Sequence, residues 1–549
     1  MFAWNHRGLL DGRLTGQKLT TSVCFAASSG FFLLGYDQGV MSGIITEPIF
    51  LQQFPQMAPT NKSGAIQALV VAIYEIGCLI GAAGIIAFGD KLGRRRAVII
   101  GASIMLVGAA IQTSSFGIAQ LIVGRIVTGV GNGMNTSTIP VWQSEMAPPK
   151  IRGFLVLFEG ALITAGIALS YWLNYGFWFV TQYGSFQWRF PIAFQCLFGV
   201  ILIIGVWLCP ESPRWLLKHG KEEDAAIIMS HIHEADPQDP IIQEDIKEIN
   251  ELNAMTESQK LSWKELFTNG PEMNRWRFSV ACGSQAFQQI TGINLVTYYA
   301  TTVFEMSLKF NGKNSRFITA WLGTEYFIAA VLALFIVDRF GRRNLMMFGA
   351  AGLAISLLII GASLSAATDS NRKPAIAATV FIFVYDTAFA IGWLGVTWLY
   401  PAEITPLRIR AETNGFSTCS NWLFNYAVVQ LAPIMINRIA WKTYFVFFCF
   451  NICFIPLVYL FFPEPNGHKL ETLDAIFNEA HEKGENPVFT EKRWRKKGGR
   501  KASEPKANVG DAGHVVNEDE KENDRRLEDL NQQTRHDENI GERTGNGSV

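Results

Sequence analysis

Twelve apolar runs, each long enough to cross a lipid bilayer, most constrain what this chain can fold into. A transmembrane helix needs about 20 predominantly apolar residues. Runs of this length lie at residues 21–45, 64–88, 97–115, 117–140, 154–180, 190–209, 277–305, 317–337, 344–366, 375–400, 412–437 and 443–462. Because a segment in lipid must satisfy its backbone hydrogen bonds internally, we predict that each run is helical. The predicted fold class is therefore an all-α, multi-pass membrane protein.

Three short motifs occur once in each half of the chain. They begin at Asp90 and Asp338, at Glu145 and Glu403, and at Pro210 and Pro463. The offsets between the copies are 248, 258 and 253 residues. Landmarks that recur in one order at nearly one spacing indicate two homologous halves of six spans each. Two such halves, packed together, imply a cavity between them near the middle of the bilayer.

The distribution of charge suggests how the chain is divided and oriented. Basic residues gather in the loops after the second, fourth, eighth and tenth spans, so the positive-inside rule places these loops and both termini in the cytoplasm. We expect a cytoplasmic N-terminal segment (1–20), an N-terminal six-helix half (21–215), a cytoplasmic helical linker (216–276), a C-terminal six-helix half (277–465) and a cytoplasmic tail (466–549). A disordered linker is the alternative to a small helical layer. The charged tail is expected to be largely disordered, from about residue 478 onward.

The seventh span carries a dense set of uncharged polar side chains between Gln288 and Tyr299. Amides and hydroxyls are costly against lipid, so they should face protein, water or a ligand. Gly292 favours a break, which would bring the amides of Gln288 and Asn294 onto one cavity wall. Uncharged amides and phenols suit a neutral, hydroxyl-rich ligand. The alternative is that these groups only hydrogen-bond neighbouring helices.

Two opposite charges lie inside the predicted membrane region, Asp37 in the first span and Arg125 in the fourth. An unpaired charge in the membrane costs several kcal/mol, so each needs a partner. A carboxylate that pairs with arginine when ionised, and is otherwise neutralised by a proton, is a proton-coupling device. A permanent structural ion pair is the alternative. Four further acids have roles that the sequence leaves open: Glu75, Glu159, Glu325 and Asp386.

The recurring loop motifs combine acids with arginines. The expected ion pairs, which bridge helix ends, are Asp90 with Arg94 and Arg95, Glu145 with Arg152, Asp338 with Arg342 and Arg343, and Glu403 with Arg410. Bridges between the halves would form when the cytoplasmic side is shut and break when it opens, which describes a two-state gate. Topology and interface anchoring are the alternative. The candidate gate residues are Asp90, Arg94, Arg95, Glu145, Arg152, Asp338, Arg342, Arg343, Glu403 and Arg410.

Composition and motifs disfavour several other classes of function. Lys and Arg together number 47, as do Asp and Glu, so nothing favours nucleic acid as a partner. The eight cysteines are scattered and lack a metal-ligand spacing. The glycines of 129–133 lie in a span with no preceding strand, so they predict close helix packing rather than a dinucleotide loop. We predict no enzyme activity, no cofactor and no metal.

Further motifs accompany the two Asp-x-x-Gly-Arg-Arg loops: Gly-Tyr-Asp at 35–37, Pro-Glu-Ser-Pro-Arg-Trp-Leu at 210–216, Gln-Gln-Ile-Thr-Gly-Ile-Asn at 288–294 and Pro-Ala-Glu at 401–403. Together they resemble the sugar porter family of the major facilitator superfamily, and within it the fungal monosaccharide:proton symporters. The resemblance runs from about Gly35 to Asp474. It implies the major facilitator fold, alternating access by two six-helix halves, and a sugar bound mainly by the C-terminal half.

The resemblance also implies roles for single residues. The expected sugar contacts are Gln288, Gln289, Asn294, Asn421 and Asn425, with Trp398 as an apolar wall and Tyr298 near the outer gate. In proton-driven family members an aspartate at the position of Asp37 pairs with an arginine at the position of Arg125. Uniporters commonly lack this aspartate, so its presence favours symport.

Two departures from the family pattern touch the expected pocket. Gly160 stands where the family often has a sugar-binding Gln, and Leu394-Gly395 stands where Gly-Pro is frequent. They leave the identity of the sugar open. We predict a plasma-membrane, proton-coupled transporter of hexoses or pentoses, whose partners are sugar, protons and the bilayer. A facilitative uniporter, a polyol or glycerol symporter, and a non-transporting sugar sensor are the alternatives.

Overall fold

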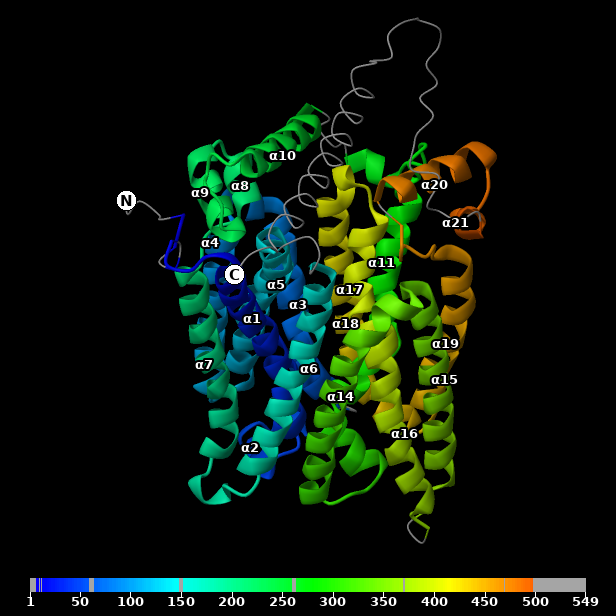
Figure 1. Ribbon diagram of the computed structural model, residues 1–549. Coiled ribbons are helices and arrows are strands. Elements are labelled where there is room, and N and C mark those ends of the chain that lie inside the picture. Colours follow the sequence, from blue (N-terminus) through cyan, green and yellow to red (C-terminus); the bar gives the residue numbers. More distant parts are fainter. Residues whose placement is uncertain are drawn as a thin grey trace, which may run out of the picture. The chain divides into compact units, whose positions relative to one another are not determined.

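The structure, a computed structural model, describes residues 6–8, 10, 12–58, 64–147, 152–258, 263–368, 371–468 and 470–496. These residues are nearly all helical, as the sequence predicts (Figure 1). The first six spans form α1 (Gly16–Ile44), α3 (Ala65–Leu92), α4 (Arg94–Thr113), α5 (Ile118–Met146), α6 (Arg152–Phe177) and α7 (Phe186–Leu208). The short helix α2 (Pro48–Gln53) follows α1.

The second six spans include two interrupted helices. The seventh consists of α11 (Asn274–Ile290), α12 (Ile293–Thr297), α13 (Ala300–Thr302) and the π-helical turn η6 (Val303–Ser307). The tenth consists of α16 (Lys373–Phe389), the π-helical turn η7 (Ala390–Leu394) and α17 (Val396–Ile404). The others are α14 (Gly312–Phe340), α15 (Arg342–Ala366), α18 (Arg410–Ile439) and α19 (Lys442–Phe461).

Nine helical segments of the described residues are long and apolar enough to cross a membrane. The other three predicted spans are α5, α18 and the seventh span. α5 and α18 are 29 and 30 residues long, but they bury polar side chains such as Arg125 and Asn421, which lower their hydropathy. The seventh span is divided into shorter helices and also buries amides. Because polar groups inside a membrane helix bundle commonly mark functional sites, the three least apolar spans are the candidates to form one.

The two halves repeat one local structure at the Asp-x-x-Gly-Arg-Arg loops. Gly93 and Gly341 separate consecutive helices with positive φ angles of 84° and 83°, a conformation that favours glycine. Glu211 then accepts hydrogen bonds from the first backbone N–H groups of α4 at 3.1 and 3.2 Å. Glu464 does the same for α15 at 2.9 Å. Each carboxylate complements the positive end of a helix dipole, so the repeat in sequence is also a repeat in structure.

Helices from the linker and from the tail lie at the same end of the bundle, which we call the linker end (Figure 1). They are α8 (Pro213–Lys218), α9 (Glu222–His233), α10 (Pro240–Ser258), the 3-10 helix η5 (Trp263–Phe267), α20 (Leu470–Lys483) and α21 (Pro487–Lys496). The expectation of disorder from about residue 478 does not hold as far as Lys496, because Ala480 and Val488 are buried where α20 packs on α21. Residues 497–549 lie outside the described residues.

Close helix contacts build the N-terminal half and join it to the C-terminal half. An added Cβ on Gly81 would lie 2.1 Å from the carbonyl oxygen of Val130, and one on Gly133 would lie 2.0 Å from that of Cys78, so only glycine lets α3 approach α5. This supports packing as the role of the glycine motif. Between the halves, α3 packs on α18 and α6 packs on α14.

Candidate functional site

The break in the seventh span organises the candidate site. α11 ends at Ile290, Gly292 has a φ of 95°, and α12 begins at Ile293. An added Cβ on Gly292 would lie 2.8 Å from the ring of Phe447, so both the backbone angle and the space require glycine. The predicted break is therefore present. It turns the amide of Asn294 toward that of Gln289, to which it donates a hydrogen bond.

Five predicted sugar contacts form one hydrogen-bonded amide cluster, defined here as Gln288, Gln289, Asn294, Asn421 and Asn425. Gln289 donates to the side-chain oxygen of Asn421 at 3.0 Å, and Asn421 donates to that of Gln288 at 2.8 Å. Asn294 donates to Asn425 at 2.7 Å. All five side chains are buried. α11, α12 and α18 thus bring together amides that lie more than 120 residues apart in the sequence.

A cavity of about 50 Å³ lies beside the amide cluster and is lined by both halves. Its lining residues are Leu34, Gln38, Ile163, Ile167, Gln288, Gln289, Ile293, Asn294, Thr297, Tyr326, Phe389, Leu394, Trp398, Asn421, Trp422 and Asn425. Space of this size holds about four waters, which is less than a monosaccharide needs. The amides therefore bond to one another and also face a cavity, so the two interpretations of their role are both partly met in this conformation.

Six of the seven predicted sugar contacts line this cavity, and Tyr298 does not. Tyr298 instead donates its hydroxyl to Glu75 on α3 of the other half. Gln38 also lines the cavity and was not predicted, although an amide next to Asp37 in an apolar span is a visible signal. Tyr326 and Phe389 line it as well, and their orientation toward the cavity depends on how α14 and α16 are rotated.

The acid of the first span meets the arginine of the fourth. The Asp37 carboxylate lies 3.4 Å from the Arg125 guanidinium, and both side chains are 0% exposed. Arg125 also donates to the backbone oxygen of Val71 at 3.3 Å and lies 4.4 Å from the centre of the Tyr74 ring. The second oxygen of Asp37 has no hydrogen-bond partner among the described residues. The pair lies close to the cavity, because Gln38, which follows Asp37 in the sequence, lines it.

Hydrogen bonds join the two halves at the end opposite the linker, which we call the far end. Arg316 at the start of α14 donates to the backbone oxygen of Gly43 at 3.0 Å and to the hydroxyl of Thr46 at 2.6 Å. Nearer the cavity, Tyr171 donates to the backbone oxygen of Thr297. These contacts close the space between the halves on the far side of the cavity.

At the linker end, the loop motifs pair within each half. Arg94 contacts Glu145 through two hydrogen bonds of 3.1 Å, and Arg342 contacts Glu403 through two of 3.1 and 3.0 Å. Asp90 lies 3.8 Å from Arg94. The two motifs of one half therefore bind each other, because the C-terminal end of one helix lies beside the N-terminal end of another.

The remaining candidate gate residues have other partners. Arg95 and Arg343 donate to backbone oxygens at the ends of α7 and α19, so Arg95 does not adopt the expected pairing with Asp90. A buried guanidinium supplies several donors, and the free carbonyls at a helix end accept them. Arg410 donates to the backbone oxygen of Thr405 at 2.9 Å. The side chains of Arg152 and Asp338 lie outside the described residues.

Of the four acids whose role the sequence left open, Glu75, Glu159 and Asp386 are buried and Glu325 is half-buried. Glu75 accepts from Tyr298, and Glu325 accepts from Thr387. Asp386 has one oxygen without a partner among the described residues. Gly160 lies near the cavity wall, where an added Cβ would be 3.5 Å from Leu394. Gly160 therefore faces Leu394, which lines the cavity.

The chain is similar to known proteins in both sequence and structure. The family described as "Sugar (and other) transporter" matches residues 23–477. The Sugar transporter STL1 of Saccharomyces cerevisiae is 37% identical over 485 residues, which cover 86% of this chain and 84% of that protein. The Hexose transporter HXT13 of the same yeast is 32% identical over 481 residues, covering 85% and 84%.

Among solved structures, the major facilitator superfamily proton:xylose symporter XylE bound to 6-bromo-6-deoxy-D-glucose matches with a TM-score of 0.71. The identity is 26%, and the match covers 84% of this chain and 99% of that one. The inward open conformation of the xylose transporter XylE from E. coli gives a TM-score of 0.68 at 26% identity, covering 83% and 99%. The major facilitator fold predicted from the sequence is confirmed by these likenesses.

Proposed function

Because the chain belongs to the sugar (and other) transporter family, we propose that it carries a monosaccharide across the membrane by proton-coupled alternating access. The chain is a transporter rather than an enzyme. The observation that best supports a sugar is the lining of the cavity. Six amide side chains face it, and none of the described residues that line it carries a charge. An uncharged, hydrogen-bonding wall suits a ligand that is itself uncharged and rich in hydroxyls.

The amide cluster can exchange partners without losing hydrogen bonds. Each amide both donates and accepts, and so does each sugar hydroxyl. When the cavity widens, bonds such as that between Gln289 and Asn421 are replaced by bonds to the ligand. Trp398 and Trp422 supply apolar surface for the C–H face of the ring. A buried polar site of this kind rejects a ligand that lacks the matching hydroxyls, because its own amides would be left unpaired.

Proton coupling is supported by the buried pair of Asp37 and Arg125. A proton on the carboxylate removes one charge and weakens the ion pair, so α1 and α5 have two electrostatic states. Because Gln38 follows Asp37 and lines the cavity, a change in the charge of Asp37 acts directly on the proposed sugar site. XylE, which shares the fold, is a proton:xylose symporter. We infer that the N-terminal half takes up the proton and the C-terminal half takes up the sugar.

Alternating access needs gates at both ends of the cavity. At the far end, the gate consists of the Tyr298–Glu75 contact and the bonds from Arg316. At the linker end, the motif pairs Arg94–Glu145 and Arg342–Glu403 brace each half, so that the halves can rotate as units. We place the linker end and both termini in the cytoplasm, and the protein in the plasma membrane.

The test is uptake of radiolabelled hexoses, pentoses and polyols in a host without sugar carriers, with and without a protonophore. We expect at least one monosaccharide to accumulate above its external concentration, and the protonophore to reduce it to equilibrium. Uptake that the protonophore leaves unchanged would indicate a uniporter. If no compound in the panel enters the cells, the transport proposal is wrong and a sensor is favoured.

A polyol symporter is the second candidate, and one observation favours it. The cavity of about 50 Å³ is small, and Leu394 narrows it next to Gly160. A three- to six-carbon open-chain polyol needs less width than a pyranose ring. The same uptake panel separates the two, because a polyol carrier accumulates glycerol or a longer polyol while hexoses fail to compete for its uptake.

A further inference from the structure

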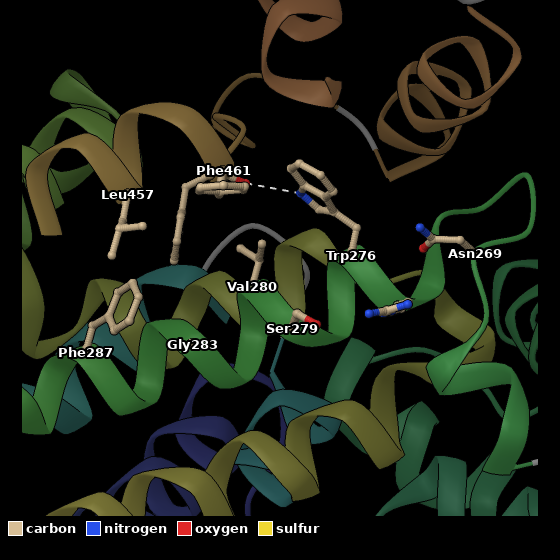
Figure 2. Close-up of a pocket in the computed structure, with 10 residues that line it drawn as sticks. Asn269, Trp276, Ser279, Val280, Gly283, Phe287, Leu457 and Phe461 are labelled. Carbon is tan, nitrogen blue, oxygen red and sulfur yellow. Dashed lines mark hydrogen bonds between the residues drawn. The ribbon is translucent and has the colours of Figure 1, made fainter. Parts of the chain in front are cut away.

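A second and larger hollow lies on the outer surface of the C-terminal half. It is a groove of about 490 Å³ between α11 and α19 at the linker end. The groove is lined by Asn269, Arg275, Trp276, Ser279, Val280, Gly283, Phe287, Leu457, Phe461 and Phe462. Figure 2 shows Phe287, Val280 and Gly283 along α11, with Leu457 and Phe461 facing them from α19. None of the residues of the sugar site lines it.

The groove changes from polar to apolar along its length. Asn269, Arg275 and Trp276 lie at one end, and Gly283, Phe287 and Leu457 lie toward the other. Arg275 and Phe287 are twelve positions apart on one helix, which corresponds to about 18 Å at 1.5 Å per residue. Half of the hydrocarbon core of a bilayer is about 15 Å thick. The groove therefore spans one leaflet, with its polar end at the level of the membrane surface.

The polar end carries positive charge that the protein does not neutralise. Arg275 is exposed and forms no side-chain hydrogen bond or ion pair among the described residues. Trp276 donates its indole N–H to the backbone oxygen of Phe461 at 3.2 Å, which fixes an amphipathic ring at the mouth. α21, which contacts α19, adds Lys492 and Lys496 at the same end. These charges are complementary to an anionic headgroup.

The apolar end is open because one position lacks a side chain. An added Cβ on Gly283 would meet no atom within 4 Å, so the floor of the groove is empty there. Phe287 stacks on Phe454 with ring centroids 4.5 Å apart and an angle of 17° between the planes, which holds the two walls at a fixed separation. A flexible alkyl chain fills such a slot without any change in the protein.

We propose that the groove between α11 and α19 binds an anionic glycerophospholipid, with its phosphate at Arg275 and one acyl chain along Gly283 and Phe287. The bound lipid connects α11 to α19 through surface that otherwise faces the membrane. α11 also carries Gln288 and Gln289 of the amide cluster, so the lipid steadies the helix that presents the sugar contacts. The site is independent of which sugar is carried and of proton coupling.

The test measures the lipid that the full chain retains. The purified protein is incubated in detergent with equal amounts of dioleoyl phosphatidylserine and dioleoyl phosphatidylcholine, washed, and analysed by quantitative mass spectrometry. We expect phosphatidylserine to be retained in preference. Arg275→Ala should lower its retention about fivefold and leave phosphatidylcholine unchanged, since one cation near a membrane surface contributes an effect of this size.

The acyl half of the site is tested by filling the slot. Gly283→Leu should reduce retained phosphatidylserine at least as much as Arg275→Ala, whereas Gly283→Ala should leave it bound. Gly84→Leu is the matched control, because Gly84 on α3 also has open space around an added Cβ but lies in the other half. Equal retention of both lipids by the unaltered chain overturns the proposal, as does unchanged phosphatidylserine in Gly283→Leu. Displacement by excess inorganic phosphate would assign Arg275 to a free anion and would also overturn it.

Discussion

The two six-helix halves share a backbone pattern but place different chemistry at the central cavity. In the N-terminal half the fully buried polar groups near the cavity include the ionisable Asp37, Arg125 and Glu75, and the amide of Gln38 lines the cavity beside them. In the C-terminal half they are chiefly neutral amides, of which Asn294 and Asn421 are typical. A duplicated scaffold can thus serve two tasks, because an ionisable group responds to protons and an amide responds to hydroxyls. At the linker end, in contrast, both halves form the same arginine–glutamate contact and the same carboxylate contact at a helix start.

The largest effect is expected from the centre of the amide cluster. Asn421 bonds to both Gln288 and Gln289, so Asn421→Ala removes one hydrogen bond from each of these buried amides. Each such loss costs about 1–3 kcal/mol, so sugar affinity should fall about ten- to a hundredfold. Equilibrium binding of labelled sugar measures the change. Asn414→Ala on the same helix, outside the cavity, is the control and should bind normally. An equal loss of sugar affinity in both variants would contradict the proposal that the amide cluster binds the sugar.

A smaller effect is expected for Tyr298 of the C-terminal half, which contacts Glu75 of the N-terminal half. Tyr298→Phe removes the hydroxyl that binds Glu75, so the far end should open more often. In cells that express Ile293→Cys, an impermeant thiol reagent added outside should react about tenfold faster once Tyr298→Phe is also present, which corresponds to about 1.4 kcal/mol. The chain without the introduced cysteine gives the background. An unchanged rate would show that this contact does not hold the far end shut.

The equivalent pairs at the linker end should respond alike. Arg94→Lys and Arg342→Lys keep the charge but lose the two-bond contact with Glu145 and Glu403. We expect each to lower the maximal transport rate about two- to fivefold with little change in sugar affinity, because a two-bond pair exceeds a single contact by about 1 kcal/mol or less. Rates measured with purified protein in vesicles test this. A large loss in one variant alone would mean that the two halves use their motifs differently.

The smallest effect is expected for Glu272, which attaches the end of the linker to Arg408. Burial acts to raise the pKa of Glu272, but hydrogen bonds from Arg408 and Asn274 outweigh it and lower that pKa below its ordinary value. A lowered carboxyl pKa contributes stability at neutral pH, and this contribution is lost as the pH falls through the lowered value. Because the pair is partly exposed, the contribution is less than about 1 kcal/mol.

Thermal unfolding measures this contribution. Glu272→Gln should lower the melting temperature slightly at pH 7, and the difference from the unaltered chain should shrink as the pH approaches 4. The exposed Glu482→Gln is the control and should show no difference at either pH. A difference that grows on acidification would contradict the assignment of the pKa direction.

The sequence revealed the chemistry of the site better than its geometry. The break at Gly292 and the ion pair of Asp37 with Arg125 follow from simple rules. Glycine permits the turn, and an unpaired charge in the membrane is costly, so opposite charges pair. The contribution of Tyr326 depends on the rotation of α14, which no pattern in the sequence specifies. The partner of Arg94 was also not predictable, because the two acids and three arginines of one half allow several pairings, and only the packing of α4 on α5 selects one.

The central claim is that proton binding at Asp37 in the N-terminal half drives uptake of the sugar that the amides of the C-terminal half bind. It is tested by measuring uphill sugar accumulation and sugar exchange at equilibrium in the same vesicles containing the Asp37→Asn variant. Loss of accumulation with exchange retained is the predicted result, because a neutral side chain mimics the protonated carboxyl and leaves the sugar site intact. Full accumulation in this variant would contradict the account.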